Sequence, residues 1–151
     1  MMYYTREEVI AFLESKDYEK FDFYEDERFG TATIDTKDGY EICIETVGGE
    51  ITEENRLLAL KVLKELDEAV NRARPWLGHF NLKHDRWHPD ALDAGYVISF
   101  IYIGRYETGG MRRPQYHGFA ITFDTVNPYP DEFTVKYLDN FNPFSVEETV
   151  S

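Results

Sequence analysis

Apolar and polar residues alternate over several short stretches of the chain, and this period of two predicts β-strands. The predicted strands cover residues 29–35, 40–45, 96–103, 118–123 and 133–138. Asp38-Gly39 separates the first two and favours a hairpin turn, because glycine adopts positive φ without strain. In the second strand Ile42 and Ile44 share one face, which predicts the core side. Residues 96–103 are apolar on both faces, which is typical of a strand in the middle of a sheet.

One long stretch carries apolar residues at helical spacing. Its stripe consists of Ala59, Val62, Leu63, Leu66, Ala69, Val70 and Ala73. Thr52 is a suitable N-cap for this helix, and Pro75 is expected to end it because proline has no backbone N–H. The pattern therefore predicts a single helix from about Glu53 to Ala73.

A shorter helix is predicted near the N-terminus. Thr5 and Glu8 have the spacing of a capping box, and apolar residues recur at helical intervals up to about Glu14. Residues 16–27 mix acidic and aromatic side chains without a clear period. This segment is interpreted as a connector whose aromatic rings pack under the sheet.

These elements predict an α+β fold. It consists of a single, mostly antiparallel sheet of about five strands packed against one long helix, with a short N-terminal helix in addition. Residues 76–94 and 104–116 have no regular pattern and are expected to form loops. The chain has 151 residues and 42% hydrophobic residues, which fits a single domain over residues 1–151.

The chain is strongly acidic. It contains 16 Lys and Arg against 29 Asp and Glu, a formal net charge of −13. This charge repels phosphate backbones and anionic membrane surfaces, so neither nucleic acid nor a membrane is an expected partner. No apolar run approaches the roughly 20 residues of a membrane-spanning helix. An acidic field favours a basic protein partner, although charge that serves only solubility is an equally simple reading.

The most acidic and aromatic segment lies early in the chain. It includes Asp22, Tyr24, Glu25, Asp26 and Glu27, and the residues before position 76 hold 19 acidic and 10 basic side chains. The segment lacks the spacing of an EF-hand calcium loop. A solvated acidic run explains it, and so does a surface whose carboxylates and rings occupy a basic groove on a partner.

A histidine cluster provides an alternative site. His79, His84 and His88 fall within ten residues. Asp85, Asp90 and Asp93 accompany them. Zinc binds imidazole and carboxylate groups, so the cluster suggests a metal-dependent hydrolase. The spacing matches no established zinc signature, however, and an aromatic surface loop accounts for the same residues. No cofactor motif is present, and no cofactor is expected.

Two further residues are candidate catalytic groups. Cys43 is the only cysteine, so it forms no disulfide within the chain. It lies between acidic neighbours that disfavour the reactive thiolate, and it is interpreted as structural. His117 has no identifiable partner in the sequence and is interpreted as a hydrogen-bonded structural residue. We therefore expect a protein without catalytic residues, located in the cytoplasm, where cysteines stay reduced.

Three segments carry a resemblance to known proteins. They are residues 133–148 (FTVKYLDNFNPFSVEE), Phe29-Gly30 at the start of a strand, and Leu66-Asp67 in the long helix. Together they resemble small bacterial domains of unknown function, some of which occur among immunity proteins of toxin systems. The resemblance implies a cytoplasmic bacterial protein that binds and neutralises a toxin. It assigns no functional residue.

The leading hypothesis is thus a non-enzymatic binding protein whose acidic and aromatic surface engages a basic, toxin-like partner. The metal-dependent hydrolase built on His79, His84 and His88 is the second hypothesis. A self-associating structural module is the third, and the sequence leaves the oligomeric state open.

Overall fold

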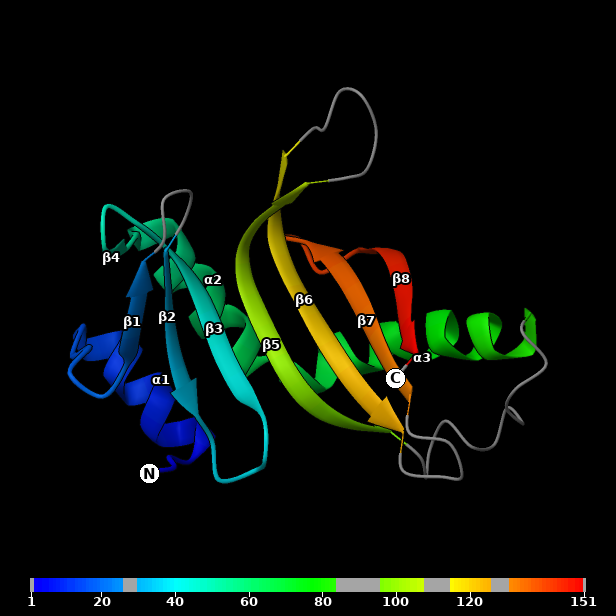
Figure 1. Cartoon of the computed structure of the whole chain (residues 1–151), viewed down its shortest axis with the longest axis horizontal. Coiled ribbons are helices and arrows are strands. Elements are labelled where there is room, and N and C mark those ends of the chain that lie inside the picture. Colours follow the sequence, from blue (N-terminus) through cyan, green and yellow to red (C-terminus); the bar gives the residue numbers. More distant parts are fainter. Residues whose placement is uncertain (1, 26–29, 84–95, 108–114, 126–130, 151) are drawn as a thin grey trace.

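A computed structural model describes residues 2–25, 30–83, 96–107, 115–125 and 131–150. In these residues a layer of three helices covers one face of a single sheet, and the other face carries no helix (Figure 1). The helices are α1 (Arg6–Ser15), α2 (Glu53–Lys64) and α3 (Leu66–Lys83). The strands are β1 (Asp22–Glu25), β2 (Gly30–Asp35), β3 (Glu41–Val47), β4 (Glu50–Ile51), β5 (Tyr96–Glu107), β6 (Gln115–Thr125), β7 (Asp131–Leu138) and β8 (Pro143–Val150).

The sheet consists of two antiparallel units joined by one parallel contact. Its order is β1-β2-β3-β5-β6-β7-β8, and β4 pairs with β3 beside this path. All described pairings between these strands are antiparallel except β3 with β5, where residues 41–44 lie beside residues 100–103. We call these four residue pairs the seam. Because parallel neighbours need a crossover connection, α2 and α3 lie between the two strands in the sequence and cover one face of the sheet.

The prediction of about five strands against one long helix is wrong. The described residues form an eight-stranded mixed sheet and three helices, an arrangement that is still of the α+β type. The sequence pattern missed β1 because all its residues are exposed, and it missed β8 because its described side chains are only partly buried. Neither strand shows the contrast of buried and exposed positions on which the prediction depended. β4 contains only two residues.

The single predicted helix over residues 53–73 is two helices. Glu65 interrupts the stripe with φ −115° and ψ 32°, and α3 then continues through Pro75 to Lys83. Proline removes the N–H that would bond to the carbonyl of Asn71, but Asn71 is exposed and water can replace that partner. The predicted loop at residues 76–94 is therefore helical up to Lys83. Within the described residues, none of the helices combines the length and hydrophobicity needed to cross a membrane.

Several local predictions are confirmed. α1 begins with a complete capping box between Thr5 and Glu8. β2 and β3 form the predicted hairpin, and Gly39 has φ +93° in its turn. The strand at residues 96–103 is central, but it extends to Glu107, and the next strand begins at Gln115. Residues 104–107 and 115–116 of the expected loop are therefore in strands, and residues 108–114 lie outside the described residues. The second face of the strand at residues 96–103 is only half-buried rather than covered.

The hydrophobic core lies between the sheet and the helices. Its largest fully buried side chains include Tyr137, Phe119, Phe133, Leu13, Ile42, Ile44, Leu63, Ile101, Ile103 and Ile121. The rings of Phe119 and Tyr137 stack with centroids 4.3 Å apart. The Tyr137 hydroxyl donates a hydrogen bond to the carbonyl of Ala69 at 2.7 Å, which ties β7 to α3. α2 packs against β3 and β5, whereas α3 packs against β7 and β8.

Replacing Tyr137 with Phe should lower the free energy of unfolding by about 1–2 kcal/mol, because it removes a buried hydroxyl bond and leaves the ring packing unchanged. Urea denaturation measures this difference. The matched control is Tyr116→Phe, which removes a hydroxyl from a side chain that is 37% exposed and should change stability by less than about 0.5 kcal/mol. Equal stability of the two variants would contradict the prediction.

Candidate functional site

The predicted partner-binding residues lie on the outermost strand of the sheet. β1 carries Asp22, Tyr24 and Glu25, and it ends the strand order on its side. All four β1 residues are exposed, with Tyr24 at 60% and Phe23 at 43% of full exposure. Asp26 and Glu27 lie outside the described residues. We call residues 22–25 the acidic edge.

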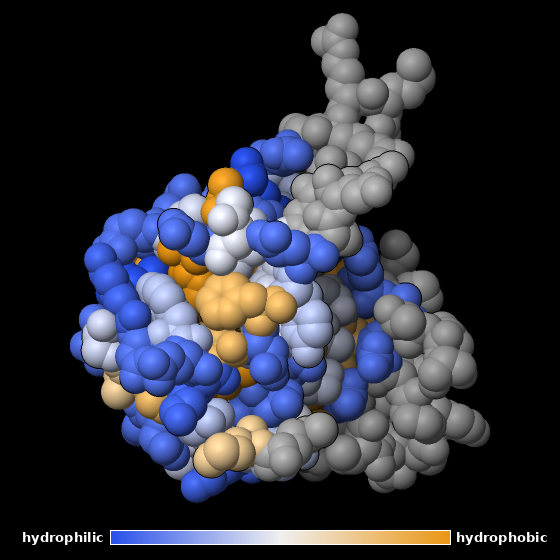
Figure 2. All heavy atoms as spheres, turned by 60° about the vertical axis from the view of Figure 1, so that its left-hand side comes forward, coloured by the Kyte–Doolittle hydropathy of each residue, from blue (hydrophilic) through white to orange (hydrophobic). Residues whose placement is uncertain are grey.

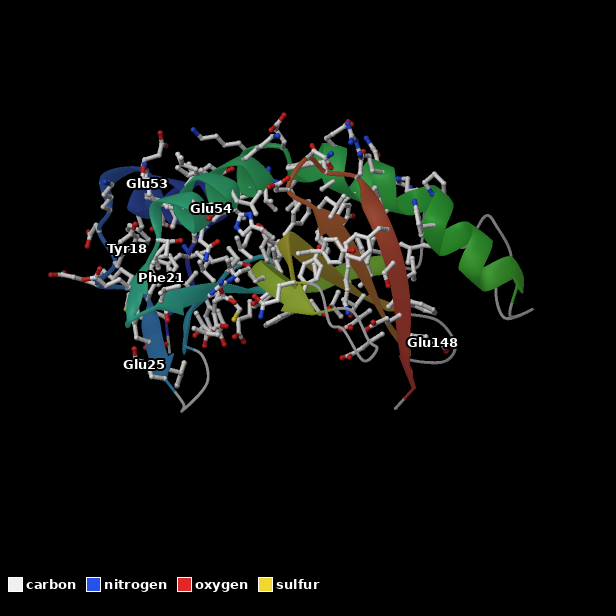
Figure 3. All side chains as sticks on the ribbon, turned by 90° about the horizontal axis from the view of Figure 1, so that it is seen from above. Tyr18, Phe21, Glu25, Glu53, Glu54 and Glu148 are labelled. Carbon is white, nitrogen blue, oxygen red and sulfur yellow. The ribbon has the colours of Figure 1, made fainter. Side chains whose placement is uncertain are left out.

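The acidic edge is held in place by what precedes it. Phe21 is buried and contacts the ring of Tyr18 edge-on, with centroids 5.9 Å apart. Figure 3 shows this pair beside the start of β1, with Glu25 at the strand's far end and Glu148 on the opposite side of the molecule. The prediction that the aromatic rings of this segment pack under the sheet is therefore correct for Phe21 and wrong for Phe23 and Tyr24.

Side chains alternate along the acidic edge. Asp22 pairs with Thr33 and Tyr24 with Thr31, whereas Phe23 pairs with the buried Ala32. Each face of β1 therefore presents one carboxylate and one aromatic ring. Seen from the β1 side of the molecule, hydrophobic residues gather in the middle of the surface and hydrophilic residues border them (Figure 2). Among the described residues, no ion pair includes Asp22 or Glu25.

A second group of polar residues meets near the seam. Sequence reasoning singled out His117 but missed its partners. The buried Asn55 at the start of α2 donates from Nδ2 to the carbonyl oxygen of Glu45 at 2.9 Å. Its Oδ1 lies 2.8 Å from Nε2 of His117 on β6. Since the amide nitrogen already donates to Glu45, Oδ1 is the acceptor, and His117 carries a proton on Nε2.

The other imidazole nitrogen faces two carboxylates. His117 Nδ1 lies 3.2 Å from Oε1 of Glu54 and 3.6 Å from Oδ2 of Asp139. It is buried and makes no aligned hydrogen bond with any described residue. We call His117, Asn55, Glu54 and Asp139 the His117 cluster. The described contacts of the cluster include no hydroxyl or thiol, so they form no pair of base and nucleophile.

An ion pair between a buried carboxylate and an exposed guanidinium group lies next to the His117 cluster. Glu45 is 8% exposed, and its Oε1 accepts a hydrogen bond from Arg105 Nε at 3.0 Å. The hydroxyl of Tyr102 has one proton and two acceptors in reach, the carbonyl oxygen of Arg105 at 2.8 Å and Oε2 of Glu45 at 3.2 Å. Burial, followed by the negative charge of Glu45, raises the pKa of Tyr102, so this residue remains a neutral donor. Arg105 is thus the firm partner of the buried carboxylate, and Tyr102 shares its proton between Glu45 and the Arg105 backbone.

The histidines of the alternative metal site are not brought together by any described contact. His79 belongs to α3, although its side chain lies outside the description, and His84 and His88 lie outside the described residues. In the part of the chain that is described, no group of three or more His, Cys, Asp or Glu is arranged to hold a metal ion. The metal-dependent hydrolase stays a prediction.

Cys43 is buried in β3. Burial raises the pKa of its thiol to about 11, and the negative charge of Glu41 adds to this effect. The thiol is therefore almost entirely protonated at neutral pH, as its interpretation as a structural residue requires.

The chain was compared with protein-family models, curated proteins and solved structures, and none of them gave a significant match. The two polar sites are accordingly interpreted from their own geometry.

Replacing Asn55 with Ala should lower the free energy of unfolding by about 2–4 kcal/mol, because it leaves the Glu45 carbonyl and His117 Nε2 without their partner. Thermal or urea unfolding measures the loss. Asn71→Ala is the control, since Asn71 is exposed on α3 and should cost less than about 0.5 kcal/mol. If Asn55→Ala lowers the free energy of unfolding no more than the control does, the hydrogen bonds of Asn55 do not stabilise the fold.

Cys43 should react with Ellman's reagent at pH 8 about 100-fold more slowly than an ordinary thiol. A rise in pKa from 9.0 to about 11 lowers the thiolate fraction by this factor, and burial slows access further. A Ser15→Cys variant provides an exposed thiol on α1 for comparison and should show one fast and one slow phase. A single fast phase for two thiols would contradict the prediction.

Proposed function

We propose that this chain is a non-enzymatic binding protein that engages a basic protein partner through the acidic edge. The proposal is carried by one observation. The outermost strand of the sheet exposes all its residues, and these are two carboxylates and two aromatic rings. Aromatic side chains are enriched in protein interfaces, where they supply contact area, and the carboxylates select the charge of the partner.

The net charge of the chain supports a basic partner. A formal charge of −13 attracts a positively charged protein over distances of about a Debye length and raises the association rate. The sharpest form of the proposal is a cytoplasmic immunity protein, as the resemblance to immunity-associated bacterial domains implies. A toxin that cleaves nucleic acid presents a basic groove, and an acidic protein that fills the groove blocks it.

Charge reversal at Asp22 and Glu25 should weaken partner binding by about tenfold or more, because it replaces attraction with repulsion at both carboxylates. The tagged wild-type chain and its Asp22→Lys/Glu25→Lys variant are used to capture proteins from lysate of the source cells. Retained proteins are eluted with a salt gradient and identified. We expect the wild type to retain one basic protein that salt releases.

The control reverses two exposed charges on the helix layer, Glu65→Lys/Asp67→Lys, so that both variants have the same net charge. It should retain the basic protein, and both variants should unfold at nearly the wild-type urea concentration. The proposal fails if no basic protein is retained. It also fails if the two variants retain it equally, because binding would then depend on net charge and not on the acidic edge.

A further inference from the structure

We infer that the partner binds the acidic edge as an extended strand that adds to β1, with two basic side chains three positions apart. This inference rests on the proposed function and specifies how the partner is recognised. Its evidence is the position of β1 in the sheet, the charges along it and the alternation of its side chains.

β1 presents an open strand edge. It pairs with β2 through four residue pairs, and in the described part of the chain no strand pairs with its other side. The rest of β2's outer side is already covered, because Tyr4 lies beside Thr36 and bonds to the backbone of Asp35 and Lys37 at 3.1 and 2.8 Å. The outermost backbone therefore belongs to β1 beside residues 30–33 and to Tyr4 beside Thr36. Backbone N–H and C=O groups that point away from a sheet are ready to pair with another strand.

The charges on β1 disfavour a second copy of this chain as the added strand. Full antiparallel pairing of two β1 strands places Asp22 of each copy opposite Glu25 of the other. Like charges in directly opposed positions destabilise a strand pair, and each copy also has a net charge of −13. The same two positions favour a strand that carries Lys or Arg opposite each carboxylate.

The order of residues on β1 defines the pattern that the partner needs. Asp22 and Glu25 are three positions apart, so they lie on opposite faces of the strand, with Phe23 and Tyr24 between them. A complementary antiparallel strand reads basic, apolar, apolar, basic. Its apolar side chains then cover the two exposed rings, and each cation also lies near a ring on its own face, where a cation–π contact adds to the ion pair.

The test uses fluorescein-labelled ten-residue peptides and the full chain, with binding measured by fluorescence anisotropy. The first peptide contains Arg-Val-Val-Arg flanked by Ser and Gly. Its control contains Arg-Val-Arg-Val, which has the same composition but places both cations on one face. We expect the first peptide to bind about tenfold more tightly than the control, because only its spacing matches both carboxylates.

Backbone methylation separates strand addition from simple charge attraction. Alternate amides of an added antiparallel strand donate to β1, and the others point away from it. Two further peptides therefore carry N-methyl groups at either the odd or the even positions of the motif. One set should lose affinity about tenfold or more, since it removes the bonds to β1, and the other set should bind much as the unmethylated peptide does.

Charge exchange provides an independent readout. The Asp22→Lys/Glu25→Lys variant should no longer bind the Arg-Val-Val-Arg peptide and should bind an Asp-Val-Val-Asp peptide instead. The second peptide restores the pairs of opposite charges with reversed signs. Equal affinity of both methylated peptides would overturn strand addition and leave binding at the acidic edge intact. Failure of the unmethylated peptide to bind would also overturn it. The capture experiment above decides the proposed function separately, since it depends on no backbone pairing.

Discussion

The parallel contact between β3 and β5 is the constraint on which the rest of the structure depends. Only four residue pairs form this seam, yet they join two antiparallel units into one sheet. Parallel neighbours cannot be linked by a tight turn, so the chain makes a crossover that includes α2 and α3. Ile42, Ile44, Ile101 and Ile103 are completely buried there under the helices. Burial of these four side chains stabilises the short contact, because each transfers a whole branched side chain from water.

The seam also explains why a polar network is buried beside the core. Residue pairing between β3 and β5 stops at Ile44 and Ile103, and the polar side chains that follow must find partners. They find these partners in one another. Asn55 on α2 bonds to His117 and to the backbone of Glu45, and the Glu45 carboxylate pairs with Arg105. Gly104 is needed beside this network. It has φ +150°, and a Cβ at this position would lie 2.5 Å from the Cβ of Glu45. Its missing side chain lets the two strands come close enough for the ion pair.

The acidic edge is a consequence of the same topology. With the parallel contact in the middle of the sheet, β1 and β8 become the outermost strands, and β1 has no helix to cover it (Figure 1). An uncovered strand is a risk for aggregation, and charged residues are a common protection. Here the protecting residues are acidic in an acidic chain, so they repel other copies and at the same time favour a basic partner. In the proposed function, protection and recognition depend on the same two carboxylates.

Several local structural elements of this protein could be predicted from the sequence alone. Residues close together in the chain set each of these elements, so their patterns are visible without a structure. They are the capping box of α1, the turn at Gly39, the β2–β3 hairpin and the acidic surface segment. Tertiary structure alone decided the rest. β1 and β8 are strands because a neighbouring strand supplies their hydrogen bonds, not because of their hydrophobic pattern. Pro75 stays inside α3, and His117 meets Asn55 across 62 positions of sequence. Such pairings are settled only when the whole sheet assembles, because their partners are distant in the chain and leave no periodic signal.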